Sequence, residues 1–336
     1  MKVKALAAHS AGQELKPFEY DLPSISGDQV DIDVETCGIC HSDLSMLKNE
    51  WGMTTYPFVP GHEVSGTVHA VGPEVKHLKI GQRVGLGWYA GSCLTCKSCV
   101  GGDLNLCPTA QGTIVGRHGG FASHVRARSA WVSPLPEGID PKVVGPLFCG
   151  GITVFSPIVE FDVKPTDRVG VIGVGGLGHL AVQFLAKWGC EVIAFSSSPD
   201  KAEQVKKLGA HQVVGTRDQA AIEKLSGSID FLITTINQPL DWDKLLGVLS
   251  AKGRLHFVGA VLEPIKVGAF SMITQQKSIS GSPLGKPATI AKMLEFCTRH
   301  SIAPMVEFFP LSKANEAVAH VEAGKARYRV VLTNDL

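Results

Sequence analysis

The longest stretch of this chain without a charged side chain, Val169 to Ala186, constrains the fold more than any other feature. Its length raises the question of a membrane span. However, the stretch contains five glycines, and its polar side chains include His179 and Gln183. Crowded glycines indicate a tight turn, and the apolar residues that follow them have helical spacing. The stretch therefore predicts a buried strand, a glycine turn and a packed helix.

The glycines of this turn have the spacing Gly173-x-Gly175-x-x-Gly178. Such spacing is weak by itself, but between a predicted strand and a predicted helix it puts a pyrophosphate at the N-terminus of the helix. The sequence therefore predicts a dinucleotide site with main-chain contacts from Gly173, Gly175, Gly176, Leu177 and Gly178.

Apolar strand-like runs alternate with helical patterns from Arg168 onward, as in the βαβ units of a parallel sheet. The patterns leave open whether residues from 287 onward extend this sheet or return to the first part of the chain. The strand-like runs predict a six-stranded, doubly wound Rossmann sheet, and they cover 168–174, 191–197, 211–215, 231–237, 253–260 and 276–282. The helical patterns cover 178–189, 198–209, 218–226 and 240–253.

The first 135 or so residues have a different pattern, in which short period-2 runs are separated by Gly and Pro. This pattern predicts an all-β, barrel-like domain. A chain of 336 residues is also longer than one hydrophobic core usually serves, so two domains are expected.

Four of the nine cysteines, Cys93, Cys96, Cys99 and Cys107, lie close together in a Gly-rich segment. Four thiolates can surround one tetrahedral Zn²⁺ and leave no open position, which is typical of a structural site. Two short disulfides and an iron–sulfur cluster are the alternatives. A reducing compartment disfavours the disulfides, and nothing else in the chain indicates an electron-transfer partner.

A second candidate set is spread more widely and consists of Cys40, His62 with its neighbour Glu63, and Cys149. Two sulfurs and one imidazole can hold Zn²⁺ with a fourth position open to water or a carbonyl oxygen, as a catalytic Lewis acid requires. Cys37 stands three residues before Cys40 and could suggest another ligand set.

Three cysteines, Cys37, Cys190 and Cys297, are expected to be structural or incidental, because a lone cysteine is usually a small buried hydrophobe. The nine cysteines then divide into four at a structural zinc, two at a catalytic zinc and three outside both, so two Zn²⁺ ions per chain are expected.

The predicted second strand of the Rossmann sheet ends in Ser196, Ser197 and Ser198, with Lys201 just beyond. Proteins that bind NAD usually carry Asp or Glu at this place for the ribose hydroxyls. Hydroxyls and a cation suit a 2′-phosphate instead, so the sequence favours NADP(H). The alternative is that the serine run only caps the following helix.

Lys and Arg number 32 against 31 Asp and Glu, a formal net charge of +1. Such a balance provides no basic field for nucleic acid or for an anionic membrane surface. The first residues contain no apolar run long enough for a signal peptide, so a cytoplasmic protein is expected.

Together these residues resemble the zinc-dependent medium-chain alcohol dehydrogenases, especially the cinnamyl alcohol dehydrogenase branch and its bacterial NADPH-dependent aldehyde reductases. The resemblance implies a GroES-like, mostly β catalytic domain from residues 1–149 and 286–336, a Rossmann NADP-binding domain at 150–285, and a homodimer. The motifs that carry it are GICHSDL, YPFVPGHE, the four-cysteine lobe, PLFCGGITVF, IGVGGLGH, FSSS, GSPLG and KARYRVVL.

The resemblance also implies roles for single residues. Cys40, His62 and Cys149 match the catalytic zinc ligands, Glu63 a carboxylate that can exchange onto the metal, and Asp43 the carboxylate that orients the histidine. Matches to cofactor contacts are His41, Thr153, Thr235, Val258, Ser282 and Arg327, and candidate walls of the substrate pocket are Trp51, Tyr56, Trp88 and Phe270.

Ser42 matches the hydroxyl that exchanges a proton with the substrate oxygen. Where many relatives end the proton relay with a histidine, this chain has Ser45, so His41 or ordered water is expected to serve. The resulting prediction is a zinc enzyme that reversibly reduces aldehydes to primary alcohols with NADPH. The alternatives are a non-catalytic redox sensor that binds zinc and dinucleotide, and a polyol-type dehydrogenase of the same fold.

Overall fold

The computed structural model describes residues 1–198 and 201–336. The chain forms two compact units, and the first unit is built from both of its ends. Unit 1 comprises Met1–Ile152 and Gly285–Leu336, and unit 2 comprises Thr153–Leu284.

Unit 2 is built on a parallel sheet with the strand order β12-β11-β10-β13-β14-β15. The chain starts at the central strand β10, moves outward through β11 to β12, and then builds the other half, so the predicted doubly wound fold is confirmed. The strands are β10 (Arg168–Ile172), β11 (Glu191–Ser196), β12 (Gln212–Gly215), β13 (Ile229–Thr234), β14 (Leu249–Phe257) and β15 (Ser278–Gly281).

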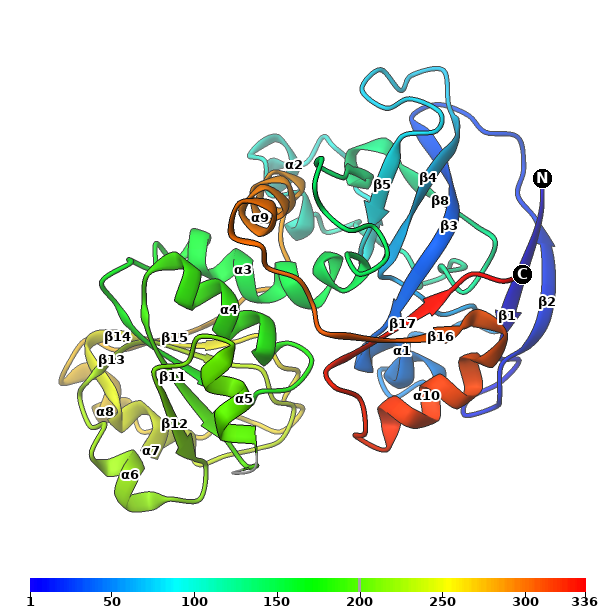
Figure 1. Cartoon of the computed structure of the whole chain (residues 1–336). Helices are drawn as coiled ribbons and strands as arrows, with labels where there is room; N and C mark the ends of the chain where they lie inside the picture. The colour runs from blue at the N-terminus through cyan, green and yellow to red at the C-terminus, as the bar shows by residue number, and fades with distance from the viewer. Residues whose placement is uncertain (199–200) are drawn as a thin grey trace. The chain divides into compact units, whose positions relative to one another are not determined.

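Helices connect these strands, and α4 and α5 lie in front of the sheet in the view of Figure 1. The predicted helix over 198–209 includes residues 199 and 200, which lie outside the described residues. The helices of this unit are α3 (Gly150–Glu160), which begins in unit 1, α4 (Gly178–Trp188), α5 (Ala202–Lys207), α6 (Gln219–Glu223), α7 (Trp242–Gly247) and α8 (Ala269–Ile273).

The prediction of a helix over 240–253 is wrong in its second half, because α7 ends at Gly247 and β14 begins at Leu249. Leu249 is fully buried and pairs with Ile229, whereas Arg254 pairs with Phe231. The residues between Leu249 and Arg254 bulge out of the ladder. Burial of Leu249 against β13 therefore overrides the helical spacing of the segment.

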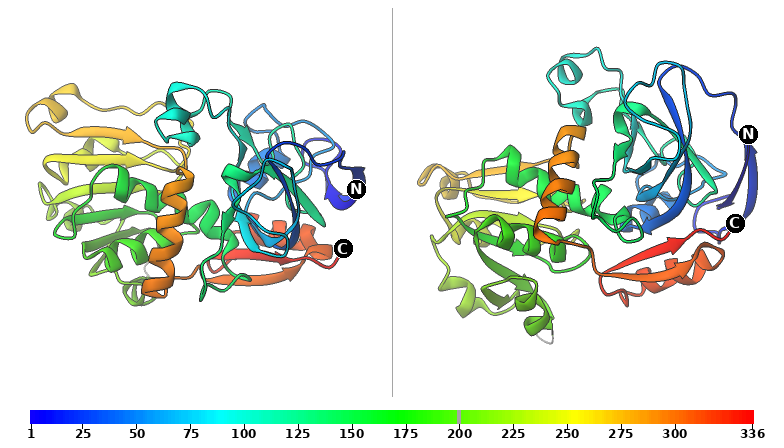
Figure 2. Two further views of the ribbon diagram at one scale, coloured as in Figure 1. Left: turned by 90° about the horizontal axis from the view of Figure 1, so that it is seen from above. Right: turned by 45° about the horizontal axis from the view of Figure 1, so that its top comes forward.

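Unit 1 holds a mixed sheet around β3 (Gln29–Ile39), and one edge of β3 pairs with β4 (Val64–Val71) along most of its length. The other edge pairs with β8 (His124–Arg128) near the start of β3 and with β17 (Arg329–Thr333) near its end. Residues from 287 onward thus return to the first part of the chain, and Figure 2 shows β17, in red, beside β3, in blue.

Most elements of unit 1 are short, and its longest strand and helix are β3 and α9. Its strands are β1 (Lys2–Ala7), β2 (Lys16–Asp21), β3 (Gln29–Ile39), β4 (Val64–Val71), β5 (Arg83–Leu86), β6 (Tyr89–Gly91), β7 (Gln111–Gly112), β8 (His124–Arg128), β9 (Ser133–Pro134), β16 (Val306–Pro310) and β17 (Arg329–Thr333). Its α-helices are α1 (His41–Leu47), α2 (Lys97–Val100), α9 (Pro287–His300) and α10 (Ala314–Glu322), and its 3₁₀ helices are η1 (Leu104–Leu106), η2 (Ser129–Trp131), η3 (Gly145–Phe148) and η5 (Leu311–Lys313).

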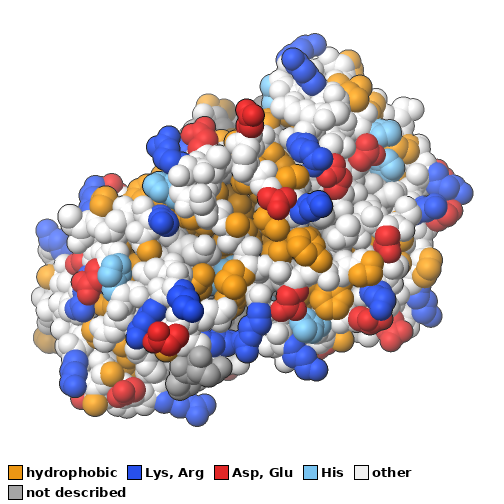
Figure 3. Space-filling view, viewed as in Figure 1, with side chains coloured by type: hydrophobic (Ala, Val, Ile, Leu, Met, Phe, Trp, Pro, Cys, Tyr) orange, Lys and Arg blue, Asp and Glu red, His pale blue; other side chains and the backbone are white. Residues whose placement is uncertain are grey.

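Basic and acidic side chains are interspersed on the face shown in Figure 3. Unit 2 carries large apolar side chains that are strongly exposed before and within α8, namely Leu262, Phe270 and Ile273. Across residues 1–198 and 201–336, no helix combines the length and apolar character that crossing a membrane requires.

A buried ion pair joins β3 to β8. Asp31 and Arg126 are directly opposite each other, and Arg126 donates to both carboxylate oxygens of Asp31 from Nε at 2.6 Å and from Nη2 at 2.8 Å. Only 3% of Asp31 and 8% of Arg126 is exposed. The fork geometry compensates both charges where water is excluded.

We expect Asp31→Asn to lower the free energy of unfolding by about 3 kcal/mol, because it leaves the guanidinium buried without an anionic partner. Urea denaturation followed by circular dichroism measures the change. The control is Glu19→Gln, which removes one partner of the exposed Lys2–Glu19 pair and should have a much smaller effect. Equal losses in the two variants would contradict a special contribution from the buried pair.

Candidate functional site

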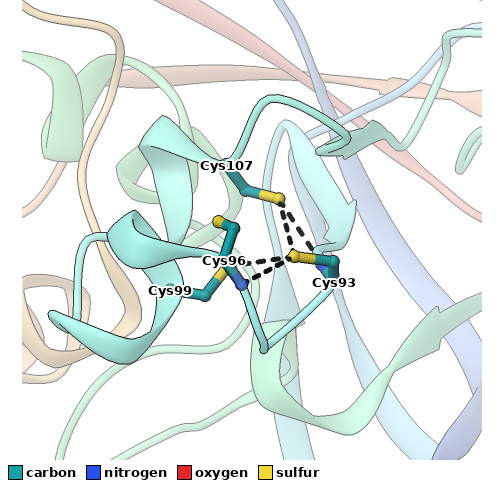
Figure 4. Close-up of side chains that lie close together, drawn as sticks. All are labelled: Cys93, Cys96, Cys99 and Cys107. Carbon is teal, nitrogen blue, oxygen red and sulfur yellow. Dashed lines mark hydrogen bonds between the residues drawn. The ribbon is translucent and has the colours of Figure 1, made fainter.

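Four cysteines converge in the lobe that follows β6, and their sulfurs all lie within 4.8 Å of one another (Figure 4). The Sγ of Cys93 lies 3.9 Å from that of Cys99 and 3.6 Å from that of Cys107. Four sulfurs at ~2.3 Å from a central Zn²⁺ form a tetrahedron with edges of about 3.8 Å. Cys93, Cys96, Cys99 and Cys107 therefore fit one zinc ion.

The local backbone favours the thiolate form of Cys93 in this lobe. The N–H of Cys96 donates to the Sγ of Cys93 at 3.3 Å, and backbone hydrogen bonds from Thr95 and Cys96 lower the pKa of Cys93 to about 5. All nine cysteines of the chain are free, so the lobe contains no disulfide. Lys286, just before α9, forms an ion pair with Asp103 of the lobe, with Nζ 2.8 Å from Oδ1.

The second set of predicted ligands also comes together, from three separate parts of unit 1. Cys40 lies between β3 and α1, His62 lies in the loop before β4, and Cys149 follows η3. The two sulfurs are 3.7 Å apart, and Nε2 of His62 lies 3.3 Å from the Sγ of Cys149. All three residues are buried, and these distances fit the edges of a zinc coordination tetrahedron.

Asp43 orients the histidine of this set. Its carboxylate accepts the N–H groups of Cys40 and Gly61, each at 2.9 Å, and lies 3.0 Å from Nδ1 of His62. Burial lowers the pKa of His62, but Asp43 and Cys40 together raise it well above its usual value. With Nδ1 held by Asp43, Nε2 faces the two sulfurs, which is the orientation of a metal ligand.

The thiol groups of Cys40 and Cys149 contact each other directly. Cys149 donates to Cys40, which lowers the pKa of Cys40 well below its usual value and raises that of Cys149. Two buried thiolates this close would repel each other strongly. A divalent cation removes that repulsion, so the donor set fits a metal.

Glu63 adds an unsatisfied carboxylate oxygen to the same site. Arg329 donates from Nη2 to Oε1 of Glu63 and, at 3.1 Å, to the carbonyl of Ile39. Burial raises the pKa of Glu63, which Arg329 opposes. Among the described residues, Oε2 of Glu63 has no hydrogen-bond partner. A buried acceptor without a donor is costly, and a nearby metal would satisfy it.

Sequence reasoning missed Arg329, although it named the neighbouring Arg327. The signal was present, because Arg329 is the first residue of β17 and is followed by the apolar run Val330–Leu332, all of it buried. A charged residue on a buried strand requires a partner of opposite charge. Which carboxylate would meet it was not readable, since Glu63 lies far away in the sequence.

Two of the four predicted pocket walls lie beside the second set of ligands. The ring of Trp88 packs edge-on against His62 with centroids 5.0 Å apart, and Trp51 packs against Trp88 at 6.0 Å. The hydroxyl of Tyr56 donates to the carbonyl of Leu47 at 3.0 Å. Phe270 lies in unit 2, on α8, and is 78% exposed.

The predicted glycine turn lies between β10 and α4. Gly173 has a φ of +86°, and a Cβ on Gly178 would collide with the carbonyl oxygen of Gly173. A Cβ on Gly175, in contrast, would enter open space, so the backbone here leaves room for a phosphate group. Thr235 closes the turn by donating to the carbonyl of Gly173 at 2.9 Å.

The serine run follows β11 at the same end of the sheet as the glycine turn, because the strands are parallel. The hydroxyl of Ser196 is buried and accepts the N–H of Ser198 at 3.1 Å, whereas Ser197 is exposed. Lys201 is the residue before α5.

The other predicted cofactor residues are distributed over both units. Thr153 is buried on α3, Val258 directly follows β14, and the hydroxyl of Ser282 lies 3.0 Å from Nε2 of His256. His41 and Arg327 are exposed in unit 1.

Comparison with known proteins indicates the same family as the sequence motifs. The family model for the alcohol dehydrogenase GroES-like domain matches residues 26–137, and that for zinc-binding dehydrogenases matches residues 176–299. The chain is 54% identical to the aldehyde reductase AdhA of Synechocystis over 99% of both chains. A cinnamyl alcohol dehydrogenase of Sorghum bicolor superposes with a TM-score of 0.94 at 34% identity, covering 99% of this chain and 98% of that one. The Helicobacter pylori CAD complexed with NADP(H) has a TM-score of 0.91 at 29% identity, with the same coverage. The chain belongs to the zinc-dependent medium-chain alcohol dehydrogenases, in the cinnamyl alcohol dehydrogenase branch.

Proposed function

We propose that this protein reversibly reduces aldehydes to primary alcohols with NADPH, using one catalytic zinc and one structural zinc per chain. The observation that carries the proposal is the buried set of Cys40, His62 and Cys149, next to the hydroxyl of Ser42. A structural metal site needs four closed ligands, whereas this set offers three and a carboxylate that can exchange. Its 54% identity to an aldehyde reductase supports the choice of substrate class.

Zinc bound by these residues supplies a Lewis acid for the substrate oxygen, and bound NADP(H) supplies or accepts the hydride. Cys40, His62 and Cys149 hold the metal, and Asp43 keeps Nε2 of His62 directed at it. Arg329 holds Glu63 through one oxygen and leaves the other available. Trp88 packs against His62 and Trp51 packs against Trp88, so apolar surface lies beside the ligands and favours an apolar aldehyde.

Ser42 is the residue that exchanges a proton with the substrate oxygen. Its hydroxyl lies 3.7 Å from the Sγ of Cys40, and Ser42 is half-buried at the start of α1. The proton continues through His41 or ordered water, because the buried Ser45 donates its hydroxyl to Glu50 at 2.7 Å. Thus the residue that replaces the usual relay histidine is engaged elsewhere.

We expect Cys40→Ala and Cys149→Ala each to reduce aldehyde turnover by about a thousandfold or more, since the Lewis acid is worth several kcal/mol in the transition state. Cys96→Ala should instead lose the zinc of the lobe and lower the melting temperature. Metal analysis, NADPH absorbance with a panel of aldehydes, and thermal melting measure the three effects, and a chelator should abolish turnover of the unchanged enzyme.

The control for these variants is Cys190→Ala, which removes a buried thiol outside both clusters and should keep metal content and activity. If Cys40, Cys96 and Cys149 variants lost activity and melting temperature in the same proportion, the division into catalytic and structural zinc would be wrong.

NADP(H) is the proposed cofactor, with Ser197 and Lys201 at its 2′-phosphate. We expect Ser197→Asp to lower kcat/KM for NADPH by about tenfold to a hundredfold and to leave that for NADH nearly unchanged, since a carboxylate repels the phosphate. Ser226→Asp places the same charge on another exposed part of unit 2 and serves as control. Equal effects on the two cofactors would contradict the assignment.

We propose a cytoplasmic homodimer joined through unit 2. Strand β15 is an edge strand, and exposed Phe270 and Ile273 lie just before it. An exposed edge with apolar neighbours is a surface that proteins cover. Light scattering should give twice 35.7 kDa, and the double variant Phe270→Glu/Ile273→Glu should give the mass of one chain. A monomer before substitution would refute this assembly.

The proposed cytoplasmic location has a different basis, because thiolate zinc sites suit a reducing compartment.

A further inference from the structure

A third group of metal-binding side chains lies on the sheet of unit 1, apart from both cysteine sets. Asp33 on β3 is directly opposite His124 on β8. On the other side of β3, the pairing with β4 passes from Ile32 and Val68 to Asp31 and Ala70, so His69 is the additional residue of a β-bulge. The three neighbouring strands therefore present Asp33, His69 and His124 together.

The distances within this group fit a coordination sphere. Nε2 of His124 lies 2.8 Å from Oδ1 of Asp33, and Nδ1 of His69 lies 3.0 Å from the same oxygen. The two rings stand nearly perpendicular, at 87°, with centroids 5.0 Å apart. Adjacent ligands at about 2.1 Å from an octahedral metal are about 3.0 Å apart.

The group is also open on the side where further ligands would bind. The side chains of His69 and Asp33 are 44% and 43% exposed, whereas His124 is 19% exposed. Water can therefore complete the coordination, as it does at sites with two histidines and one carboxylate.

Hydrogen bonds alone provide the competing account of the same geometry. The Nδ1 of His124 lies 2.9 Å from the hydroxyl of Ser123, which also accepts the N–H of Lys4 at 3.1 Å. In that account Asp33 only accepts hydrogen bonds from two imidazoles. The two accounts differ in one respect, because a purely hydrogen-bonded cluster does not take up metal.

We propose that Asp33, His69 and His124 form an additional metal site that binds a divalent transition-metal ion, with two imidazoles and one carboxylate as ligands. The site is independent of the proposed catalytic function. Imidazole ligands favour Ni²⁺, Cu²⁺ and Zn²⁺ over Mg²⁺ and Ca²⁺. Because β3 also ends just before Cys40, an ion here would cross-link the strand that leads to the catalytic ligands.

The test uses the zinc-loaded, tag-free enzyme and Ni²⁺ as the probe, since nickel can be counted separately from resident zinc. After equilibrium dialysis against graded Ni²⁺ concentrations, elemental analysis should show about one Ni²⁺ per chain with zinc unchanged. The melting temperature should rise with Ni²⁺, because the ion binds the folded state. Mg²⁺ at the same concentrations should cause neither effect.

His69→Gln and His124→Gln should each abolish the nickel uptake and the rise in melting temperature, while aldehyde reduction stays unchanged. His77→Gln, which removes an exposed imidazole from the same unit, should leave the uptake intact. Because His69 is half-exposed, its variant is expected to fold even if His124→Gln does not. The proposal is overturned if the unchanged enzyme takes up nickel only as it loses zinc, takes up none, or if His69→Gln retains it.

Discussion

The rest of the molecule depends on how buried charge is balanced around Cys40, His62 and Cys149. Two thiols, an imidazole and the carboxylates of Asp43 and Glu63 lie where water is excluded, and Arg329 supplies one positive charge. A single guanidinium cannot neutralise two carboxylates and two thiolates at once. A divalent cation would supply two further positive charges beside the two sulfurs, so this donor set favours a bound metal.

Strand β3 brings the parts of this balance together. It runs through the middle of its sheet and ends just before Cys40, while its neighbour β17 carries Arg329 and its neighbour β4 follows His62 and Glu63. The loops that hold the ligands therefore diverge from one rigid set of paired strands. This arrangement allows residues from distant parts of the sequence to keep distances of 3.3 to 3.7 Å.

Much of this could be predicted because it depends on local patterns. The glycine turn, the six parallel strands and the four-cysteine lobe each leave a short signature in the chain. The end of α7 could not be predicted, because pairing of Leu249 with Ile229 decides it. The Glu63–Arg329 pair and the group of Asp33, His69 and His124 were missed for the same reason, since pairing between distant strands creates them.

The position of Arg329 has a consequence for how the protein is made. A ribosome synthesises β3, Cys40, His62 and Glu63 long before β17, because Arg329 follows Glu63 by 266 residues. Until β17 emerges, Glu63 lacks its only charged hydrogen-bond donor among the described residues, and one edge of β3 near Cys40 is unpaired. Unit 2 has all of its strands by then and can fold first. Unit 1 can therefore complete the surroundings of Cys40, His62 and Glu63 only after β17 has been synthesised.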